Sequence, residues 1–238
     1  MTKQEFLTRF YLQTDKVSTL SGPGFEPIEV GKLATIAQEA LVLERYNPSN
    51  KSREGFEETE KRVQDLGELV AIKSITPQLP SSLNFPNGVF CELPNTQLQS
   101  AEDFSDVFWL PILEYVITKS TDSCKNNKRI QIKDIKHVEL EQLLQDPFNR
   151  PSIEWVFRVR TSGLKHELIT DGSFSVKEYI VRYIKKPQPI DLTTTLSNQV
   201  SELSDHVHQE LLEKTILMTY KSLDDLQKLQ TQVQLETN

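Results

Sequence analysis

The spacing of apolar residues changes twice along this chain of 238 residues, and the changes divide it into three parts. Within residues 1–72, apolar side chains recur at intervals of three and four, the period of an amphipathic helix. Within residues 73–190, prolines appear and the spacing shortens toward two, the period of a β-strand. Within residues 191–238, a polar crossover loop leads into a second helical pattern. We therefore expect an α+β fold in which N-terminal helical hairpins and a long C-terminal helix bracket an inserted antiparallel β portion, with residues 191–238 packing on residues 1–72.

The first part predicts three helices joined by short loops, at about residues 3–16, 27–46 and 53–70. Pro27 suits the first position of a helix, where an N–H group would have no partner within the helix. In this second helix, the residues expected to face the core are Ile28, Leu33, Ile36, Ala37, Ala40 and Leu41.

The middle part predicts several strands and two tight turns. Asn87-Gly88 between apolar residues is a hairpin signal, and Asp171-Gly172 predicts a tight turn between the run at 164–170 and the strand at 174–185. The clearest alternation of apolar and polar residues lies in 130–135, which indicates a half-buried strand. Other strands are expected at 107–117, 153–160 and 174–185, with one or two helical turns at 138–145.

The final helix is expected to begin near Ser204 and to continue through at least Leu223, with one apolar stripe along its length. About 25 residues at about 1.5 Å each would reach roughly 38 Å, more than packing on short N-terminal helices requires. An aromatic stripe in the first helix also needs a surface to cover. The residues predicted to contact a neighbouring subunit are therefore Phe6, Phe10, Tyr11, Leu226, Leu229, Val233 and Leu235.

Composition argues against several classes of function. A net charge of -7 gives no general attraction to nucleic-acid phosphates, and no apolar run approaches the roughly 18 to 20 residues that span a bilayer. The N-terminus lacks the apolar core of a signal peptide, so we expect a protein made in a reducing cytoplasm. The two cysteines, Cys91 and Cys124, are expected to be free thiols.

No motif in the chain predicts catalysis, a cofactor or a bound metal. His206 and His208 are two residues apart, whereas two metal ligands on a helix need a spacing of three or four. We expect them to pack at a seam near the start of the final helix. Serine, histidine and aspartate occur without a nucleophile elbow. A hydrolase whose site is made by the fold remains an alternative.

Blocks of sequence in the same order resemble a family of virion structural proteins. They are residues 55–66, the segment Asp146–Pro151, residues 179–190 and residues 200–210, and the resemblance covers about half of the chain. The family is that of tailed phages, and the chain is most similar to proteins of the portal-proximal neck of crAss-like podoviruses.

This resemblance implies a structural protein that forms a ring, expected to be twelve-fold, in the head-to-tail connector of a short-tailed phage. The implied partners are further copies of the chain, the portal protein and other ring proteins of the neck and tail, with passive contact to passing DNA and none to a membrane. The implied location is the virion neck, after assembly in the bacterial cytoplasm. The alternative outside viruses is a binding or scaffold module.

Overall fold

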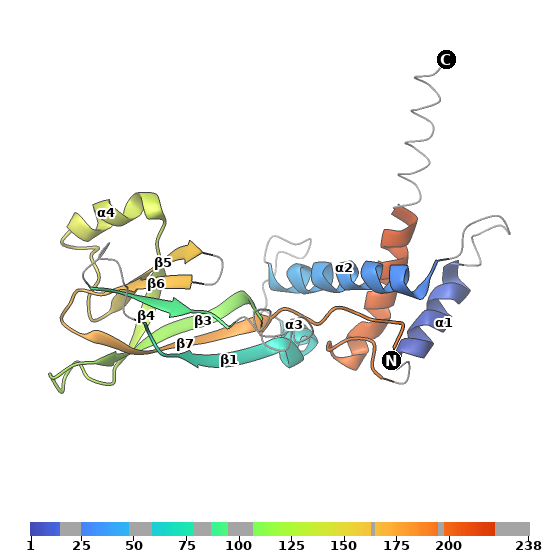
Figure 1. The fold of residues 1–238 in the computed structure, drawn as a ribbon, viewed down its shortest axis with the longest axis horizontal. Coiled ribbons are helices and arrows are strands. Elements are labelled where there is room, and N and C mark those ends of the chain that lie inside the picture. The colour runs from blue at the N-terminus through green and yellow to red at the C-terminus, as the bar shows by residue number, and fades with distance from the viewer. Residues whose placement is uncertain are drawn as a thin grey trace, which may run out of the picture. The chain divides into compact units, whose positions relative to one another are not determined.

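The computed structural model describes residues 1–14, 25–47, 59–78, 87–94, 107–162, 165–194 and 198–221 (Figure 1). The chain forms two compact units: Met1–Leu69 with Pro187–Asn238, and Val70–Lys186. We call them the helical unit and the sheet unit. Helices from both ends of the chain form the first, and a seven-stranded sheet inserted between them forms the second. The predicted α+β fold is therefore confirmed.

The helical unit is built around one apolar core. Its helices are α1 (Lys3–Thr14), α2 (Pro27–Tyr46), α3 (Glu60–Leu66) and the helix of residues 208–221, with single 3-10 turns at Gly67–Leu69 and Asp205–Val207. The core residues come from α1, α2, the segment 190–200 and the last helix: Phe6, Leu7, Phe10, Val30, Ala34, Ala37, Ile190, Leu192, Val200, Leu211, Leu212 and Ile216. The predicted helix near Ser204 thus exists, although Leu223 lies outside the described residues.

Helix α2 buries only part of the predicted face: Ala37 and Leu41 are in the core as predicted, but Ile28 and Ile36 are not. Ile28 and Ile36 are exposed by 53% and 56%, whereas Val30, Ala34, Ala37, Leu41 and Val42 are fully buried. The buried face is rich in small residues because a neighbouring segment approaches it closely. A Cβ atom placed on Gly31 would lie 2.7 Å from the carbonyl oxygen of Ile190. Close backbone approach therefore sets which side of α2 is the core side.

The third helix is shorter than predicted at its C-terminal end, because Val70 begins a strand rather than ending a helix. Helix α3 ends at Leu66, and β1 (Val70–Ile75) follows the 3-10 turn. Val70 pairs with Ile184 across an antiparallel ladder, and the pairing continues to Ile75. Cross-strand pairing here overrides the local helical spacing. The predicted start near Arg53 lies outside the described residues.

The sheet unit contains seven strands in the order β1-β7-β3-β4-β5-β6-β2. Their bounds are β2 Gly88–Glu92, β3 Phe108–Lys119, β4 Arg129–Asp134, β5 Trp155–Ser162, β6 Lys165–Ile169 and β7 Ser175–Lys185. All neighbours pair antiparallel except β4 and β5, which are parallel because α4 (His137–Gln145) connects them. The sheet curls, and Gln78, just after β1, forms a bridge with Phe90 of β2 at the opposite edge.

Of the two predicted turns, the one at Gly172 does not join neighbouring strands, and the one at Asn87-Gly88 is described only in part. Gly172 takes a positive φ of 82°, which suits glycine, but the strands it connects, β6 and β7, are not neighbours in the sheet. Strand β2, which follows Asn87, pairs with β6. The residues that would form the first strand of the predicted hairpin, 83–86, lie outside the described residues.

The two faces of the sheet are filled differently. The inner face of the curl holds a core that includes Val116, Leu168, Tyr179, Val181 and Tyr183. On the outer face, α4 covers only the half formed by β5 and β6, where Leu140 packs among Phe157, Val159 and Ile169 (Figure 1). The outer face of β1, β7, β3 and β4 has no such helix within the described part of the sheet unit.

Candidate subunit-contact surfaces and polar clusters

The aromatic residues predicted to contact a neighbour lie in the core of the helical unit. Phe6 and Phe10 are fully buried there, and the Tyr11 hydroxyl donates a hydrogen bond of 3.0 Å to the carbonyl oxygen of Phe25. The expectation of an exposed aromatic stripe is therefore wrong for Phe6 and Phe10. The last helix and α2 supply the surface that these rings cover.

The other predicted contact residues, Leu226, Leu229, Val233 and Leu235, lie outside the described part of the chain. Their role as contacts stays a prediction.

Exposed apolar side chains form a line along α2. Ile28, Ile36 and Leu43 are exposed by 53%, 56% and 43%, and their spacing of eight and seven residues keeps them on one side of the helix. We call these three residues the helix stripe. Helix α2 is therefore apolar on two sides, one in the core and one at the surface. Sequence spacing does not distinguish the exposed apolar side of α2 from the buried one, because the residues on both sides recur with the helical period.

A second set of apolar side chains lies on the outer face of β1, β7 and β3. Residues paired across neighbouring strands share a face, and Tyr115 of β3 pairs with Ile180 of β7. Leu113 and Ile72 both pair with Arg182, from opposite sides of β7. Leu113, Tyr115, Ile117, Ile72 and Ile180 form what we call the sheet stripe. Ile72 and Leu113 are exposed by 58% and 43%.

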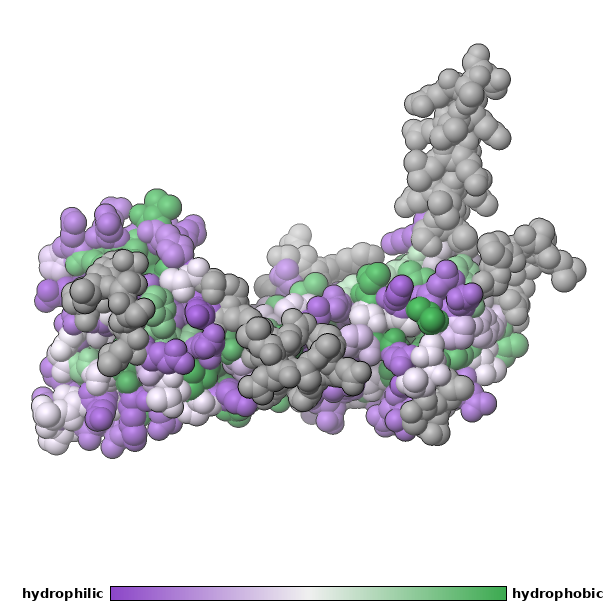
Figure 2. Space-filling model, in the orientation of Figure 1, coloured by the Kyte–Doolittle hydropathy of each residue, from purple (hydrophilic) through white to green (hydrophobic). Residues whose placement is uncertain are grey.

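Basic side chains border the sheet stripe. The Arg129 guanidinium lies 3.6 Å from the centre of the Tyr115 ring, a cation-π contact. Arg129, Lys133 and Arg182 are all exposed. Figure 2 shows that apolar residues reach the surface among polar ones in both units.

A buried polar cluster joins three elements of the helical unit. Asp65 of α3 is fully buried and accepts hydrogen bonds from Arg45 Nε at 2.8 Å and from His206 Nε2 at 2.6 Å. Arg45 also contacts Glu210 of the last helix at 2.5 Å. Burial alone would lower the pKa of Arg45, but Asp65 and Glu210 raise it, so the guanidinium stays charged. The cluster fixes α2, α3 and the last helix together.

The two histidines at the start of the last helix, one of them in the preceding 3-10 turn, have separate partners. His206 contacts Asp65, whereas His208 is fully buried and its Nδ1 lies 3.2 Å from Asp205 Oδ1. Burial lowers the pKa of His208 below its usual value. Within the described residues, no group of three or more His, Cys, Asp or Glu side chains is placed to hold a metal ion.

The sheet unit contains its own buried charged cluster, on the inner face. Arg158 of β5 forms ion pairs with Glu114 of β3 and, at 2.8 Å, with Asp134 of β4. Beside it, the Tyr179 hydroxyl lies 2.8 Å from His166 Nδ1. Burial, followed by the charge of Arg158, lowers the pKa of His166 to about 3, so the ring is neutral where it forms this hydrogen bond. These groups link β3, β4, β5, β6 and β7.

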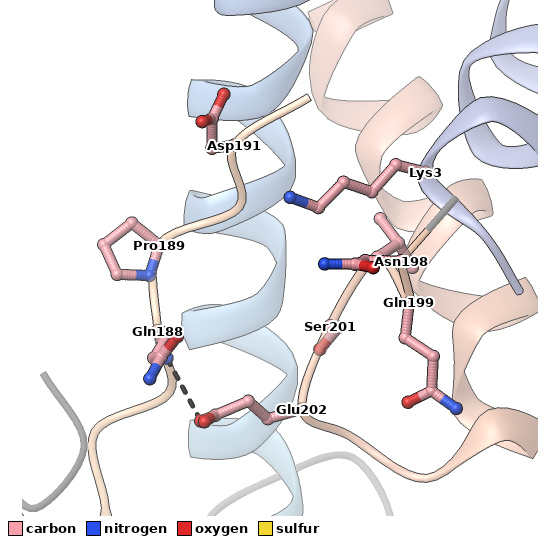
Figure 3. Close-up of a pocket in the computed structure, with 9 residues that line it drawn as sticks. Lys3, Gln188, Pro189, Asp191, Asn198, Gln199, Ser201 and Glu202 are labelled. Carbon is pink, nitrogen blue, oxygen red and sulfur yellow. Dashed lines mark hydrogen bonds between the residues drawn. The ribbon is translucent and has the colours of Figure 1, made fainter. Parts of the chain in front are cut away.

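A polar groove of about 420 Å³ lies in the helical unit, between the extended segments 188–191 and 198–202 (Figure 3). The backbone N–H of Gln188 donates to Glu202 across one end, and Lys3 donates to the carbonyl oxygen of Thr194. The Ser201 hydroxyl donates to the Gln38 side chain at 2.5 Å rather than to a base. The groove therefore lacks an activated nucleophile of the serine-histidine kind.

The described residues contain no helix that is both long and apolar enough to cross a membrane. Cys91 is a buried free thiol and Cys124 an exposed one, as predicted.

Comparison with known proteins places the chain in one family. The family model described as phage tail ring protein 3/4 matches residues 1–229. Ring protein 4/5 of Bacteroides phage crAss001 is 25% identical over 235 residues, which cover 91% of each chain. Ring protein 3 of the same phage is 26% identical over 237 residues, covering 95% of this chain and 98% of the relative. The predicted resemblance to crAss-like phage proteins is thereby confirmed, and the chain belongs to the phage tail ring protein 3/4 family, whose members are structural ring proteins of crAss-like phages.

Proposed function

We propose that the chain is a subunit of a homo-oligomeric ring in the head-to-tail connector of a short-tailed crAss-like phage. The observation that carries this proposal is the family match, which extends over residues 1–229 and therefore includes both units. The ring contains twelve copies, adjoins the portal protein and other ring proteins, and surrounds the DNA as it passes. It is assembled in the bacterial cytoplasm and remains in the virion neck.

The structure supports a role in assembly rather than in chemistry. A closed ring needs two different, complementary surfaces on each subunit, because every copy contacts its two neighbours in different ways. The helix stripe and the sheet stripe are two such surfaces. The buried charged clusters join elements within one unit, and the groove holds no activated nucleophile.

The neck contains several stacked rings, and the chain is proposed to form one of them. Ring protein 3 and ring protein 4/5 of phage crAss001 match with nearly the same identity and coverage. We therefore propose a position in the stack of rings without choosing one layer. The segment with Leu226, Leu229, Val233 and Leu235 is proposed to contact a neighbouring subunit.

An electron-microscopy map of purified virions tests the proposal. We expect density for this chain in a ring between portal and tail, with cyclic symmetry. Finding the chain only in the capsid shell or the distal tail would contradict the connector assignment.

Deleting residues 230–238 should leave the melting temperature of the chain nearly unchanged and should reduce its incorporation into virions. A large loss of thermal stability would instead make this segment part of the core.

A further inference from the structure

Among the described residues of the sheet unit, no element covers the outer face of β1, β7, β3 and β4. An antiparallel sheet with one face in water normally carries polar residues on that face. Strand β4 follows the rule, with Arg129, Gln131 and Lys133 exposed. Strand β3 does not, because its outward positions Leu113, Tyr115 and Ile117 are apolar. On the other half of the same face, α4 covers the apolar residues. The pattern on β3 is that of a sheet which receives another element.

Helix α2, through its helix stripe, is suited to cover the outer face of the sheet. Since one side of α2 is buried by its own unit, the apolar residues on the other side are not needed for the core. From Ile28 to Leu43 the stripe is roughly 22 Å long, at about 1.5 Å per residue. From Leu113 to Ile117 the sheet stripe covers roughly 13 Å of β3, at about 3.3 Å per residue. A helix laid along the strands is therefore long enough to cover the sheet stripe from end to end.

The charges around the two stripes are opposite in sign. The sheet unit has 15 Lys and Arg residues against 14 Asp and Glu, whereas the rest of the chain has 12 against 20. Beside the helix stripe are Glu29, Glu39 and Glu44, and beside the sheet stripe are Arg129, Lys133 and Arg182. Charges of the opposite sign accompany both sets: on the helical unit Lys32 of α2 and Lys214, which forms an ion pair with Glu44 at 2.5 Å, and on the sheet unit Glu178 of β7. Complementary charges of this kind set the orientation of an interface.

We propose that, in the ring, the helix stripe of one subunit packs on the sheet stripe of the next subunit. This inference rests on the proposed function, since it names the lateral contact of the ring. The occupant of the sheet stripe is a second copy of this chain, because that copy carries an apolar line long enough to cover it, with acidic residues beside the line. The contact is heterologous, so repeating it generates a ring rather than a dimer.

Disulfide trapping in the assembled ring tests the contact. All variants carry Cys124→Ser, which removes the exposed native thiol. Ile36→Cys and Ile117→Cys are then combined in one chain, and the rings are oxidised and separated on a denaturing gel. We expect a ladder of multimers that extends to the full ring. Each single variant should run as uncross-linked single chains on the gel, because a heterologous contact does not bring two copies of the same residue together.

The patterns that contradict the inference are distinct. A disulfide within one chain would mean that α2 meets the sheet of its own subunit. Dimers of the Ile36→Cys variant alone would mean that two α2 helices meet. Rings that show no ladder would disprove this contact while leaving the ring role intact. A virion map that places the chain outside any ring would refute the proposed function, and the inference with it.

Charge insertion supplies a second measurement that does not depend on disulfide geometry. Ile36→Asp or Leu113→Asp should weaken ring formation by about 10-fold to 100-fold, as is typical of central interface residues, without changing the melting temperature. Val138→Asp is the matched control, because Val138 is 93% exposed and belongs to neither stripe. Equal ring formation in all three variants would overturn the inference. So would a loss of DNA binding with unchanged ring formation in Leu113→Asp, which would make the sheet face a DNA surface.

Discussion

Replacing Arg158 with methionine should strongly destabilise the sheet unit. Arg158 is 4% exposed, and the side chain of its partner Glu114 is 8% exposed. Without the guanidinium, the Glu114 carboxylate is left in the inner core with no cation, and breaking a buried ion pair in this way costs about 3 to 5 kcal/mol. That is a large part of the roughly 5 to 15 kcal/mol that stabilises a typical domain. Urea unfolding followed by tryptophan fluorescence reports on this unit, because Trp109 and Trp155 both lie in it.

The double variant Arg158→Met with Glu114→Leu is the decisive control. Replacing both members of a buried ion pair by apolar residues of similar volume is often neutral or stabilising. Asp134, whose side chain is 57% exposed, remains solvated in either variant. We therefore expect the double variant to recover to within about 1 kcal/mol of the original chain. A single variant that loses less than about 1 kcal/mol, or a double variant that is worse than the single one, would refute the argument.

Three further outcomes follow from other buried groups. Burial lowers the pKa of His166 to about 3, so as the pH falls below about 6.5 the unfolded chain takes up a proton at His166 before the folded chain does. The free energy of unfolding should therefore fall by about 2 kcal/mol between pH 7.5 and pH 5. Urea unfolding at the two pH values should show that His166→Phe removes this loss. Gly31→Ala should lower the melting temperature, since the new Cβ would lie 2.7 Å from the Ile190 carbonyl oxygen; an unchanged value would show that the segment moves aside easily. Cys91, with its pKa raised to about 12 by burial, should react with a thiol reagent only after unfolding, whereas the exposed Cys124 should react at once; two reactive thiols in the folded chain would contradict this.

The sequence predicts the elements of this fold well where local spacing and tertiary environment agree. Residues 130–135 alternate cleanly, and β4 spans Arg129–Asp134 with Ile130 buried against the inner core. Helix α4 likewise lies where a short helix was predicted, at His137–Gln145. In both elements the apolar face packs on the sheet unit's own core, so the period alone identifies the buried side.

The strand order could not be read from the sequence, because it depends on contacts between distant residues. Strand β2 pairs with β6 at separations of 73 to 81 residues along the chain, and β1 pairs with β7 at separations of 104 to 114 residues. A turn such as Asp171-Gly172 reveals that the chain reverses, but not which strands then pair. The charged cluster of Glu114, Asp134 and Arg158 was missed for the same reason, since three separate strands contribute it.

The aromatic residues Phe6 and Phe10 were predicted to be exposed for a different physical reason. Sequence periodicity identifies an apolar side of a helix, but it does not say whether that side meets the same chain or another one. For α1 the aromatic stripe was assigned to a neighbour and is in the core, whereas for α2 Ile28 and Ile36 were assigned to the core and are exposed. Helix α2 thus carries apolar residues on a side that its own core does not bury. Such a surplus is expected of a ring subunit, because the residues that a neighbour will bury must already be apolar before the ring closes.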